Sequence, residues 1–522
     1  MKAIKKLMAA LLAVAMLCAI AVPAFADDSA SKAAAATYTV TIENPVGSYE
    51  AYQIFSGRLD EATLSDVQWG TGVTAAGQAA LGKAAERAEA LAAANTADAA
   101  KAFAKEVDAY LSNTKYESNA YAAGAATTTI SNLPAGYYLI KNKANSVGED
   151  NVYTDFIVAV VQDTKVSPKG DKPTLDKEIK HNENNTWGVV GDNQIGETVE
   201  FRTITTVPNT AGYDKYDYTI YDTMSEGLTS NVHTKADVVI KTKMVDGDVL
   251  DSSYYTVTVD VANSNKFTVK IDILKAVKDG KIAADDSLYT YYTGVLNENA
   301  KIYNENQNNE AHLEYSNNPN DDSSHGKTPD KKVYDWTYQM EVNKVDGKNN
   351  NTIDGAKFVL SRENFTMGEV NEESGLPTDT SNLIKLIAND DGSYTIAPAN
   401  YTGAITYVMT AGKITIKGLD DAVDYYLYET KAPSSYNRVT EPTKIKIEAS
   451  YNPDGSVANA PKISVNGAES TTDMKVTIEN NVGATLPGTG GIGTTIFYIV
   501  GGGLMVAAVV LLITKKRMEK NN

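Results

Sequence analysis

Three polar side chains fall where the sequence predicts the buried face of a β-strand. Lys344 shares a face with Met340 and Val342, because successive side chains of a strand point to opposite sides. Glu429 and Asn480 each end an apolar stripe in the same way. Burial lowers the pKa of a lysine and raises that of a carboxyl group by up to ~3–5 units. Each residue would be costly to bury alone, but placed together they form a reaction centre for acid–base chemistry.

The same residue types recur earlier in the chain, with Asp in place of Glu. Three further runs place one polar residue in phase with apolar residues. Lys177 lies between Leu175 and Ile179, Asp222 follows Tyr218 and Ile220, and Asn309 precedes Ala311 and Leu313. The choice of Asn309 depends on its period-two match to the apolar residues that follow it. Three other asparagines crowd around it, namely Asn304, Asn306 and Asn308.

Period-two patterns run through most of the chain and predict a mainly β protein. The 31 Tyr against 9 Phe and 3 Trp fit half-exposed sheets, because a Tyr ring packs on the pleated face while its hydroxyl stays in water. The strand patterns cover residues 38–42, 156–161, 238–243, 255–261, 267–273, 414–416 and 475–478. Residues 75–111 differ, since they are rich in Ala, Glu and Lys and lack Pro, which predicts one or two helices inserted in the first domain.

The N-terminal segment, residues 1–26, has the layout of a secretory signal peptide. It contains three Lys, then an apolar stretch, then a small-x-small sequence that ends at Ala26, the expected cleavage site. Cys18 is the single cysteine and lies inside this segment. The exported chain is therefore expected to have no thiol and no disulfide.

The C-terminal segment begins with a five-residue motif and continues as a membrane anchor. The motif is Leu486-Pro487-Gly488-Thr489-Gly490. The apolar run at 494–513 is just long enough to cross a bilayer as a helix. It is followed by Lys515, Lys516 and Arg517. These cations are expected to stay on the cytoplasmic side and to stop the helix from passing through the membrane.

Processing at both ends would leave a strongly acidic protein. It removes seven of the 48 basic and one of the 66 acidic residues, so the net charge changes from −18 to −24. Such a surface repels nucleic acid and anionic lipid, which excludes nucleic-acid binding.

About 460 residues remain, enough for roughly three domains. Polar, Pro-containing stretches at 167–173 and 317–332 are the linker candidates, and the expected division is 1–26, 27–170, 171–330, 331–484 and 485–522.

The C-terminal segment resembles the cell-wall sorting signal of Gram-positive bacteria. In that family the transpeptidase sortase cuts the LPxTG motif between Thr and Gly and passes the Thr carbonyl to an amine. The resemblance implies that Thr489 is a covalent attachment point. It also implies secretion, transient membrane anchoring before sortase cleavage, and attachment to peptidoglycan in the cell wall.

The buried polar residues carry a second resemblance. Residues 342–347, 426–433 and 478–480 resemble the first strand, the acidic E-box and the last strand of collagen-adhesin B-type domains. Residues 174–177, 218–223 and 309–313 look like the A-type middle domain of Gram-positive shaft pilins. Those domains are immunoglobulin-like β-sandwiches, each crosslinked by an internal Lys–Asn isopeptide bond. The resemblance implies two bonds, one from Lys344 to Asn480 promoted by Glu429 and one from Lys177 to Asn309 promoted by Asp222.

Shaft pilins also need an acceptor amine, which in that family lies in a Val-x-Pro-Lys context at the junction of the first two domains. Val166, Pro168 and Lys169 match this pattern, whereas Ser167 and Gly170 differ from the Tyr and Asn that are usual there. The resemblance implies that Lys169 is the acceptor. Two nearby competitors stay open, Lys165 and Lys172.

Two functions follow as hypotheses. In the first, the chain is the major shaft subunit of a covalent pilus, in which a pilus-type sortase joins Thr489 to Lys169 of the next copy. Its partners would be identical subunits, minor or tip pilins, sortase, including a housekeeping sortase, and peptidoglycan. In the second, it is a monomeric wall-anchored adhesin for a host surface ligand.

The four His show no zinc spacing, no nucleotide loop or nucleophile elbow is present, and neither a cofactor, a metal nor an enzyme acting on an external substrate is predicted.

Overall fold

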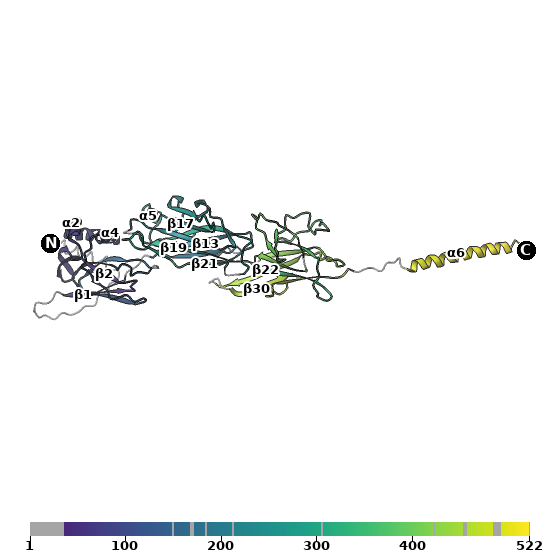
Figure 1. The fold of residues 1–522 in the computed structure, drawn as a ribbon, viewed down its shortest axis with the longest axis horizontal. Coiled ribbons are helices and arrows are strands. Elements are labelled where there is room, and N and C mark those ends of the chain that lie inside the picture. Colours follow the sequence, from purple (N-terminus) through teal and green to yellow (C-terminus); the bar gives the residue numbers. More distant parts are fainter. Residues whose placement is uncertain are drawn as a thin grey trace.

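The computed structural model describes residues 36–148, 151–167, 172–182, 185–210, 213–303, 306–410, 412–421, 423–452, 457–483 and 492–520. The chain is mainly β, as predicted, and is built from paired sheets that follow one another along the sequence. Figure 1 shows three β-rich bodies in a row along the long axis, with helix α6 at the far C-terminal end.

The first body contains two sheets and the helical insertion. Its three-stranded sheet has the order β5-β1-β8, and the other has the order β3-β2-β6-β7, with β4 paired to β2. The strands are β1 (Thr37–Glu43), β2 (Tyr49–Asp60), β3 (Thr63–Trp69), β4 (Tyr116–Glu117), β5 (Thr127–Pro134), β6 (Gly136–Asn142), β7 (Asp155–Val160) and β8 (Thr164–Val166).

The insertion forms three helices, where the sequence predicted one or two. They are α2 (Ala75–Leu81), α3 (Ala84–Ala94) and α4 (Ala97–Asp108). Gly82 ends α2 with a φ of 82°, and Asn95 ends α3 in the left-handed region with a φ of 46°, a conformation that Gly and Asn adopt most readily. Thr96 then caps α4 by accepting a hydrogen bond from the backbone N–H of Ala99. The breaks therefore come from single capping residues within a run of uniform composition.

The second body is a sandwich of a six-stranded and a seven-stranded sheet. The first has the order β10-β9-β12-β18-β14, with β15 on β18; the second has the order β11-β21-β19-β13-β17-β16, with β20 on β19. The strands of the first are β9 (Leu175–Lys180), β10 (Trp187–Gly188), β12 (Thr198–Thr206), β14 (Leu228–Ser230), β15 (Val239–Thr242) and β18 (Ser287–Leu296). Those of the second are β11 (Val190–Asp192), β13 (Tyr218–Met224), β16 (Tyr255–Val259), β17 (Lys266–Ile271), β19 (Asn308–Ser316), β20 (His325–Lys327) and β21 (Lys331–Trp336), and the helix α5 spans Ile273–Lys278.

The third body pairs two five-stranded sheets, with the orders β24-β25-β27-β22-β31 and β26-β23-β28-β29-β30. Their strands are β22 (Tyr338–Asp346), β23 (Lys357–Ser361), β24 (Leu386–Ala388), β25 (Tyr394–Ile396), β26 (Met409–Thr410), β27 (Lys413–Leu419), β28 (Asp424–Lys431), β29 (Thr443–Tyr451), β30 (Val457–Val465) and β31 (Lys475–Asn480). Helix α6 (Ile492–Met518) contains a stretch, 496–518, that is long and apolar enough to cross a membrane.

The proposed division at residue 330 stays a prediction, but one strand pairing bears on it. Strand β21 starts after that residue, and it pairs with β19 and β11 in the seven-stranded sheet of the second body. The stretch 317–332, expected as a linker, contains β20 and turns back toward the first body. There the backbone N–H of Tyr153 donates to the carbonyl of Asn317 at 2.9 Å.

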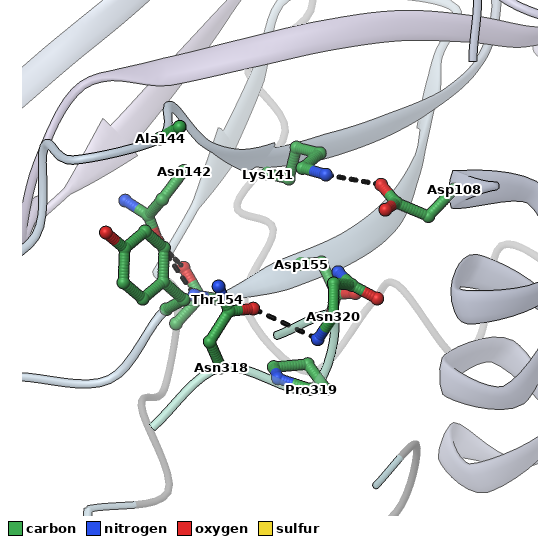
Figure 2. A pocket seen from close by; sticks show the side chains of 10 residues that line it. Asp108, Lys141, Asn142, Ala144, Thr154, Asp155, Asn318, Pro319 and Asn320 are labelled. Atoms are coloured by element: carbon green, nitrogen blue, oxygen red, sulfur yellow. Dashed lines mark hydrogen bonds and ion pairs between the residues drawn. The ribbon is translucent and has the colours of Figure 1, made fainter. Parts of the chain in front are cut away.

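Figure 2 shows the pocket that lies beside this contact. Asn318, Pro319 and Asn320 lie beside the start of β7, where Asp155 faces them. Burial raises the pKa of the Asp155 carboxyl. On the other side of the hollow, Lys141 forms an ion pair with Asp108 at the end of α4. The loop of the second body thus closes against the helical insertion and sheet of the first.

The second and third bodies share one continuous hydrophobic core. Trp336 at the end of β21 stacks on Tyr451 at the end of β29, with ring centroids 6.0 Å apart and an interplanar angle of 9°. The hydroxyl of Tyr425 donates to Oε1 of Gln194 at 3.0 Å. The hydrophobic core therefore continues through this joint.

Candidate functional site: two buried lysine centres

The third body brings Lys344, Glu429 and Asn480 together, as the strand patterns predicted. Strands β22 and β31 are parallel neighbours, with Lys344 opposite Ile478 and Asp346 opposite Asn480. Because side chains alternate along each strand, Lys344 and Asn480 both point into the space between the sheets. Glu429 comes from β28 in the facing sheet. The amine and the amide thus share one sheet, and the acid reaches them from across the core.

Hydrogen bonds link these three side chains directly. The Asn480 amide donates from Nδ2 to Oε1 of Glu429 at 2.9 Å, and Nζ of Lys344 lies 3.5 Å from the same oxygen. Nζ also donates to Oδ1 of Asn480 and, at 3.1 Å, to the carbonyl of Ile478. The backbone N–H of Val439 donates to the second oxygen of Glu429 at 2.6 Å. The carboxyl is therefore held in place while its other oxygen faces the amine and the amide.

The third-body centre is closed to water. Lys344, Glu429 and Asn480 are 0, 3 and 1% exposed. Desolvation lowers the pKa of Lys344, although the nearby Glu429 acts in the opposite direction. A lowered pKa increases the fraction of neutral amine, which is the form that can act as a nucleophile.

The second body holds Lys177, Asp222 and Asn309 in a different topology. Lys177 is on β9 of the six-stranded sheet, whereas Asp222 on β13 and Asn309 on β19 belong to the seven-stranded sheet. Strands β13 and β19 are antiparallel neighbours in which Asp222 pairs with Ala311 and Met224 with Asn309. A bond from Lys177 to Asn309 would therefore join the two sheets across the core.

A fourth side chain completes the second-body centre. Nζ of Lys177 lies 2.5 Å from Oδ2 of Asp222, and it also donates to the hydroxyl of Tyr292 on β18. That hydroxyl donates in turn to Oδ2 of Asp222 and accepts from Nδ2 of Asn309 at 3.5 Å. Among the residues that the structure describes, Oδ1 of Asn309 has no hydrogen-bond partner.

Burial shifts the second-body groups toward their neutral forms. The lysine and the carboxylate are both inaccessible at their side chains. Desolvation lowers the pKa of Lys177 and raises that of Asp222, against the opposing influence of each on the other. Desolvation also raises the pKa of Tyr292 well above its ordinary value, so its hydroxyl keeps its proton. The centre therefore favours a neutral amine beside a protonated acid.

The sequence prediction of these positions can be compared with the structure residue by residue. All six predicted side chains are buried and lie in two groups of three. Asn309 is fully buried, whereas Asn308 beside it is only partly buried, in keeping with the period-two choice. Sequence reasoning missed Tyr292. It alternates with the buried Thr290 and Leu288 on β18, a pattern that could have predicted its burial, but nothing in the sequence distinguishes its hydroxyl from those of the other tyrosines.

A second feature that the sequence did not reveal lies at the joint between the second and third bodies. Asp192 on β11 lies close to Asp420 and Asp421, which follow β27, and all three are buried. Nη2 of Arg362 is 3.9 Å from Asp420. Burial raises the pKa of Asp420 to about 9. No sequence motif signalled this group, because Asp192 on β11 is far in the chain from the adjacent Asp420 and Asp421.

Several predicted sites lie outside the described residues. These are the signal-peptide cleavage site at Ala26, the acceptor Lys169 with Pro168 and Gly170, and the sorting motif from Leu486 to Gly490. The competitor Lys165 lies on β8 and is exposed, and Lys172 is partly buried. The choice among the three lysines stays a prediction.

Comparisons with known proteins bear on the class of the chain. The model of the SpaA family, described as a prealbumin-like fold domain, matches residues 338–461. The model of the LPXTG cell wall anchor motif matches residues 478–520. None of the curated proteins searched matches the sequence at a significant level.

Solved structures of two pilins are similar to this chain. The T6 backbone pilin of serotype M6 Streptococcus pyogenes is 16% identical and has a TM-score of 0.50, over 87% of this chain and 100% of that one. The full-length major pilin SpaD from Corynebacterium diphtheriae is 17% identical with a TM-score of 0.46, over 87% of this chain and 98% of that one. Together with the two family matches, the shared fold of the first confirms the expected fold class: a wall-anchored protein with the fold of a Gram-positive backbone pilin. The predicted location at the cell wall is confirmed by the anchor motif.

Proposed function

We propose that this chain is the major shaft subunit of a sortase-assembled pilus, and that each of its two buried centres forms one internal isopeptide bond. The observation that carries the proposal is a buried lysine, asparagine and carboxyl group gathered in one centre, found twice in one wall-anchored chain. Lys344 bonds directly to Asn480, whereas Lys177 contacts Asp222 and is linked to Asn309 through the hydroxyl of Tyr292. Crosslinked domains of this kind also occur in adhesins, so the choice of a shaft subunit depends on the predicted acceptor Lys169 and on the expected three-domain length.

The third-body centre has the parts that amide exchange requires. Neutral Nζ of Lys344 attacks Cγ of Asn480, and negative charge develops on Oδ1. The Glu429 carboxylate, whose Oε1 faces both Nζ and Nδ2, takes one proton from Nζ and gives it to Nδ2. The bond from Cγ to Nδ2 breaks, Nδ2 leaves as ammonia, and the carbonyl reforms. One amide N–H remains on Nζ, and Glu429 ends as it began.

The second-body centre supports the same reaction between Lys177 and Asn309. Asp222 takes the place of the glutamate and contacts the amine at 2.5 Å. Each reaction happens once per molecule, so Asp222 and Glu429 promote an autocatalytic step and do not make the chain an enzyme in the usual sense.

Polymerisation is the second part of the proposal. A pilus-type sortase would cut after Thr489 and join its carbonyl to Lys169 of the next subunit. The anchor match over residues 478–520 supports the donor end. At the acceptor end, Ser167 donates a hydrogen bond from Oγ to Oε2 of Glu43 at 2.7 Å, which ties the chain just before the predicted acceptor to strand β1. The lysines of the two centres are buried and cannot serve as acceptors.

Peptide mapping of the full chain tests the internal bonds. The chain is digested with trypsin after expression in a Gram-positive host. The expected result is two branched peptides, Lys177 with Asn309 and Lys344 with Asn480, each lighter than its two linear parts by one ammonia. Linear peptides alone at all four positions would contradict the proposal. An immunoblot of wall extracts tests the polymer, because a ladder of high mass supports a shaft subunit and a single band near monomer mass supports a wall-anchored adhesin.

A further inference from the structure

The two centres differ at one position, and this difference defines an additional reacting group. In the third-body centre, the Asn480 amide donates directly to the carboxylate of Glu429. In the second-body centre, a tyrosine hydroxyl lies among the three predicted residues. It contacts Nζ of Lys177, Oδ2 of Asp222 and Nδ2 of Asn309.

The neighbours of this hydroxyl use all of its hydrogen-bonding capacity. A tyrosine oxygen has one proton to donate and two lone pairs. The proton goes to Asp222, and the lone pairs accept from Lys177 and Asn309. The ring is fixed as well, because it stacks on Phe201 at 5.9 Å and meets Phe267 edge-on at 5.1 Å. The hydroxyl is thus held at the centre of the group by packing that the reaction does not disturb.

We propose that Tyr292 is a catalytic residue of the second-body centre, which relays protons between Lys177, Asp222 and the departing amide nitrogen of Asn309. This inference rests on the proposed function, since it assigns a role within that bond-forming reaction. It adds a group that the sequence did not predict and that the hydrogen bonds of the third-body centre do not include.

The relay balances in two steps. Nζ attacks Cγ of Asn309, and the Asp222 carboxyl gives its proton to Oδ1. Nζ then passes a proton to the Tyr292 oxygen while the hydroxyl proton moves to Oδ2 of Asp222, along the hydrogen bonds already present.

In the second step the bond from Cγ to Nδ2 breaks. The tyrosine gives its proton to Nδ2 and regains one from Asp222, so Nδ2 leaves as ammonia. The carbonyl reforms and returns the Oδ1 proton to the carboxylate. Tyr292 and Asp222 end in their starting states, and Lys177 and Asn309 are joined through one amide.

The test is Tyr292→Phe in the full chain, with Tyr218→Phe as the matched control. Tyr218 is also fully buried in the second body, but its hydroxyl donates to the carbonyl of Thr206 at 2.8 Å rather than to a reacting group. Cell-free synthesis is stopped at intervals, and the branched and linear peptides of each centre are quantified by mass spectrometry. The bond between Lys344 and Asn480 in the same molecules serves as an internal reference.

The expected result is that Tyr292→Phe slows the second-body bond roughly 10²-fold or more, the range for loss of a positioned acid–base group, while the third-body bond and the control variant form bonds at the wild-type rate. Equal rates in Tyr292→Phe and wild type would overturn the relay and leave the proposed function standing. A wild-type chain without the second-body branched peptide would overturn both.

A second variant covers the case in which Tyr292→Phe prevents folding of the second body. A fluorotyrosine placed at position 292 keeps the ring and the hydroxyl but makes the phenol more acidic. A proton relay predicts a changed rate, and a changed pH dependence, of the bond from Lys177 to Asn309. An unchanged rate and pH profile would show that Tyr292 only fills space, and would overturn the proposal.

Discussion

The carboxylate oxygen of Glu429 that accepts a hydrogen bond from the Asn480 amide is also the oxygen that Nζ of Lys344 approaches. This arrangement aims the acid at the leaving nitrogen. The other carboxylate oxygen is occupied by the N–H of Val439, so the acid cannot turn away. Glu429 is therefore positioned for proton transfer before any bond forms.

Glu429→Gln should leave Lys344 and Asn480 unjoined, because the amide has a similar shape but cannot exchange a proton at neutral pH. The bond would close a loop between residues 136 positions apart. On the chain-entropy model for crosslinks, its loss costs about 4–5 kcal/mol of stability. Peptide mapping and thermal unfolding measure both effects. Glu341→Gln, on the outer face of β22, is the control, and a normal yield of branched peptide in Glu429→Gln would refute the assignment.

Asn309→Ala should abolish the second-body bond, whereas Asn308→Ala should leave it intact. The two residues are adjacent on β19, but Asn309 faces the core and Asn308 is only partly buried. The pair of variants therefore tests position without changing residue type. Mass spectrometry of the Lys177 peptide gives the answer, and loss of the bond in the Asn308 variant alone would mean that the partner asparagine was wrongly chosen.

Lys169→Ala should abolish the high-mass ladder and leave monomer attached to the wall. Both internal bonds should persist, because the donor motif and the two centres are unchanged. Lys165→Ala and Lys172→Ala are the matched controls, and immunoblots of wall extracts compare all three. If the ladder survives in Lys169→Ala but disappears in one of the others, that lysine is the acceptor; survival in all three would place the acceptor elsewhere.

The stability of the second body should fall as the pH rises, because of Asp335 on β21. Burial raises the pKa of the Asp335 carboxyl to about 8. The negative charges of Asp192 and Glu197 act in the same direction, whereas the hydrogen bond from Asn193 and the nearby His181 act to lower this pKa. Between the ordinary pKa of Asp, about 4, and this value, the folded state holds a proton that the unfolded state releases. Stability contributed by Asp335 is therefore complete below about pH 4 and falls as the pH rises toward 8.

Asp335→Asn should reduce this pH dependence, because asparagine resembles the protonated acid and can keep a partner in Asn193, which now donates to Oδ1 at 2.7 Å. The readout is the difference in melting temperature between pH 5 and pH 8. Asp390→Asn, at an exposed position, should behave like wild type. The same difference in all three proteins would exclude a role for Asp335.

The sequence was most informative where one rule, the alternation of strand side chains, decided the outcome. This alternation placed Lys344 and Lys177 in the core, because a lysine in phase with apolar residues lies on the same face of the strand as they do. It could not place Tyr292, since a buried tyrosine satisfies the same rule whether or not its hydroxyl reacts. The acidic group of Asp192, Asp420 and Asp421 depends on how two sandwiches pack end to end, which no local pattern encodes. The three helices likewise depend on single capping residues such as Asn95.

The pairing of β22 with β31 has a mechanical consequence. The strands are parallel and in register from Glu341 beside Lys475 to Asp346 beside Asn480, and the chain enters at the start of one and leaves at the end of the other. Tension along a shaft would pull these strands in opposite directions along their length. All the hydrogen bonds between them would then bear the load in shear at once. A covalent link from Lys344 to Asn480 would carry the same force straight across this pair and leave the rest of the third body unstretched.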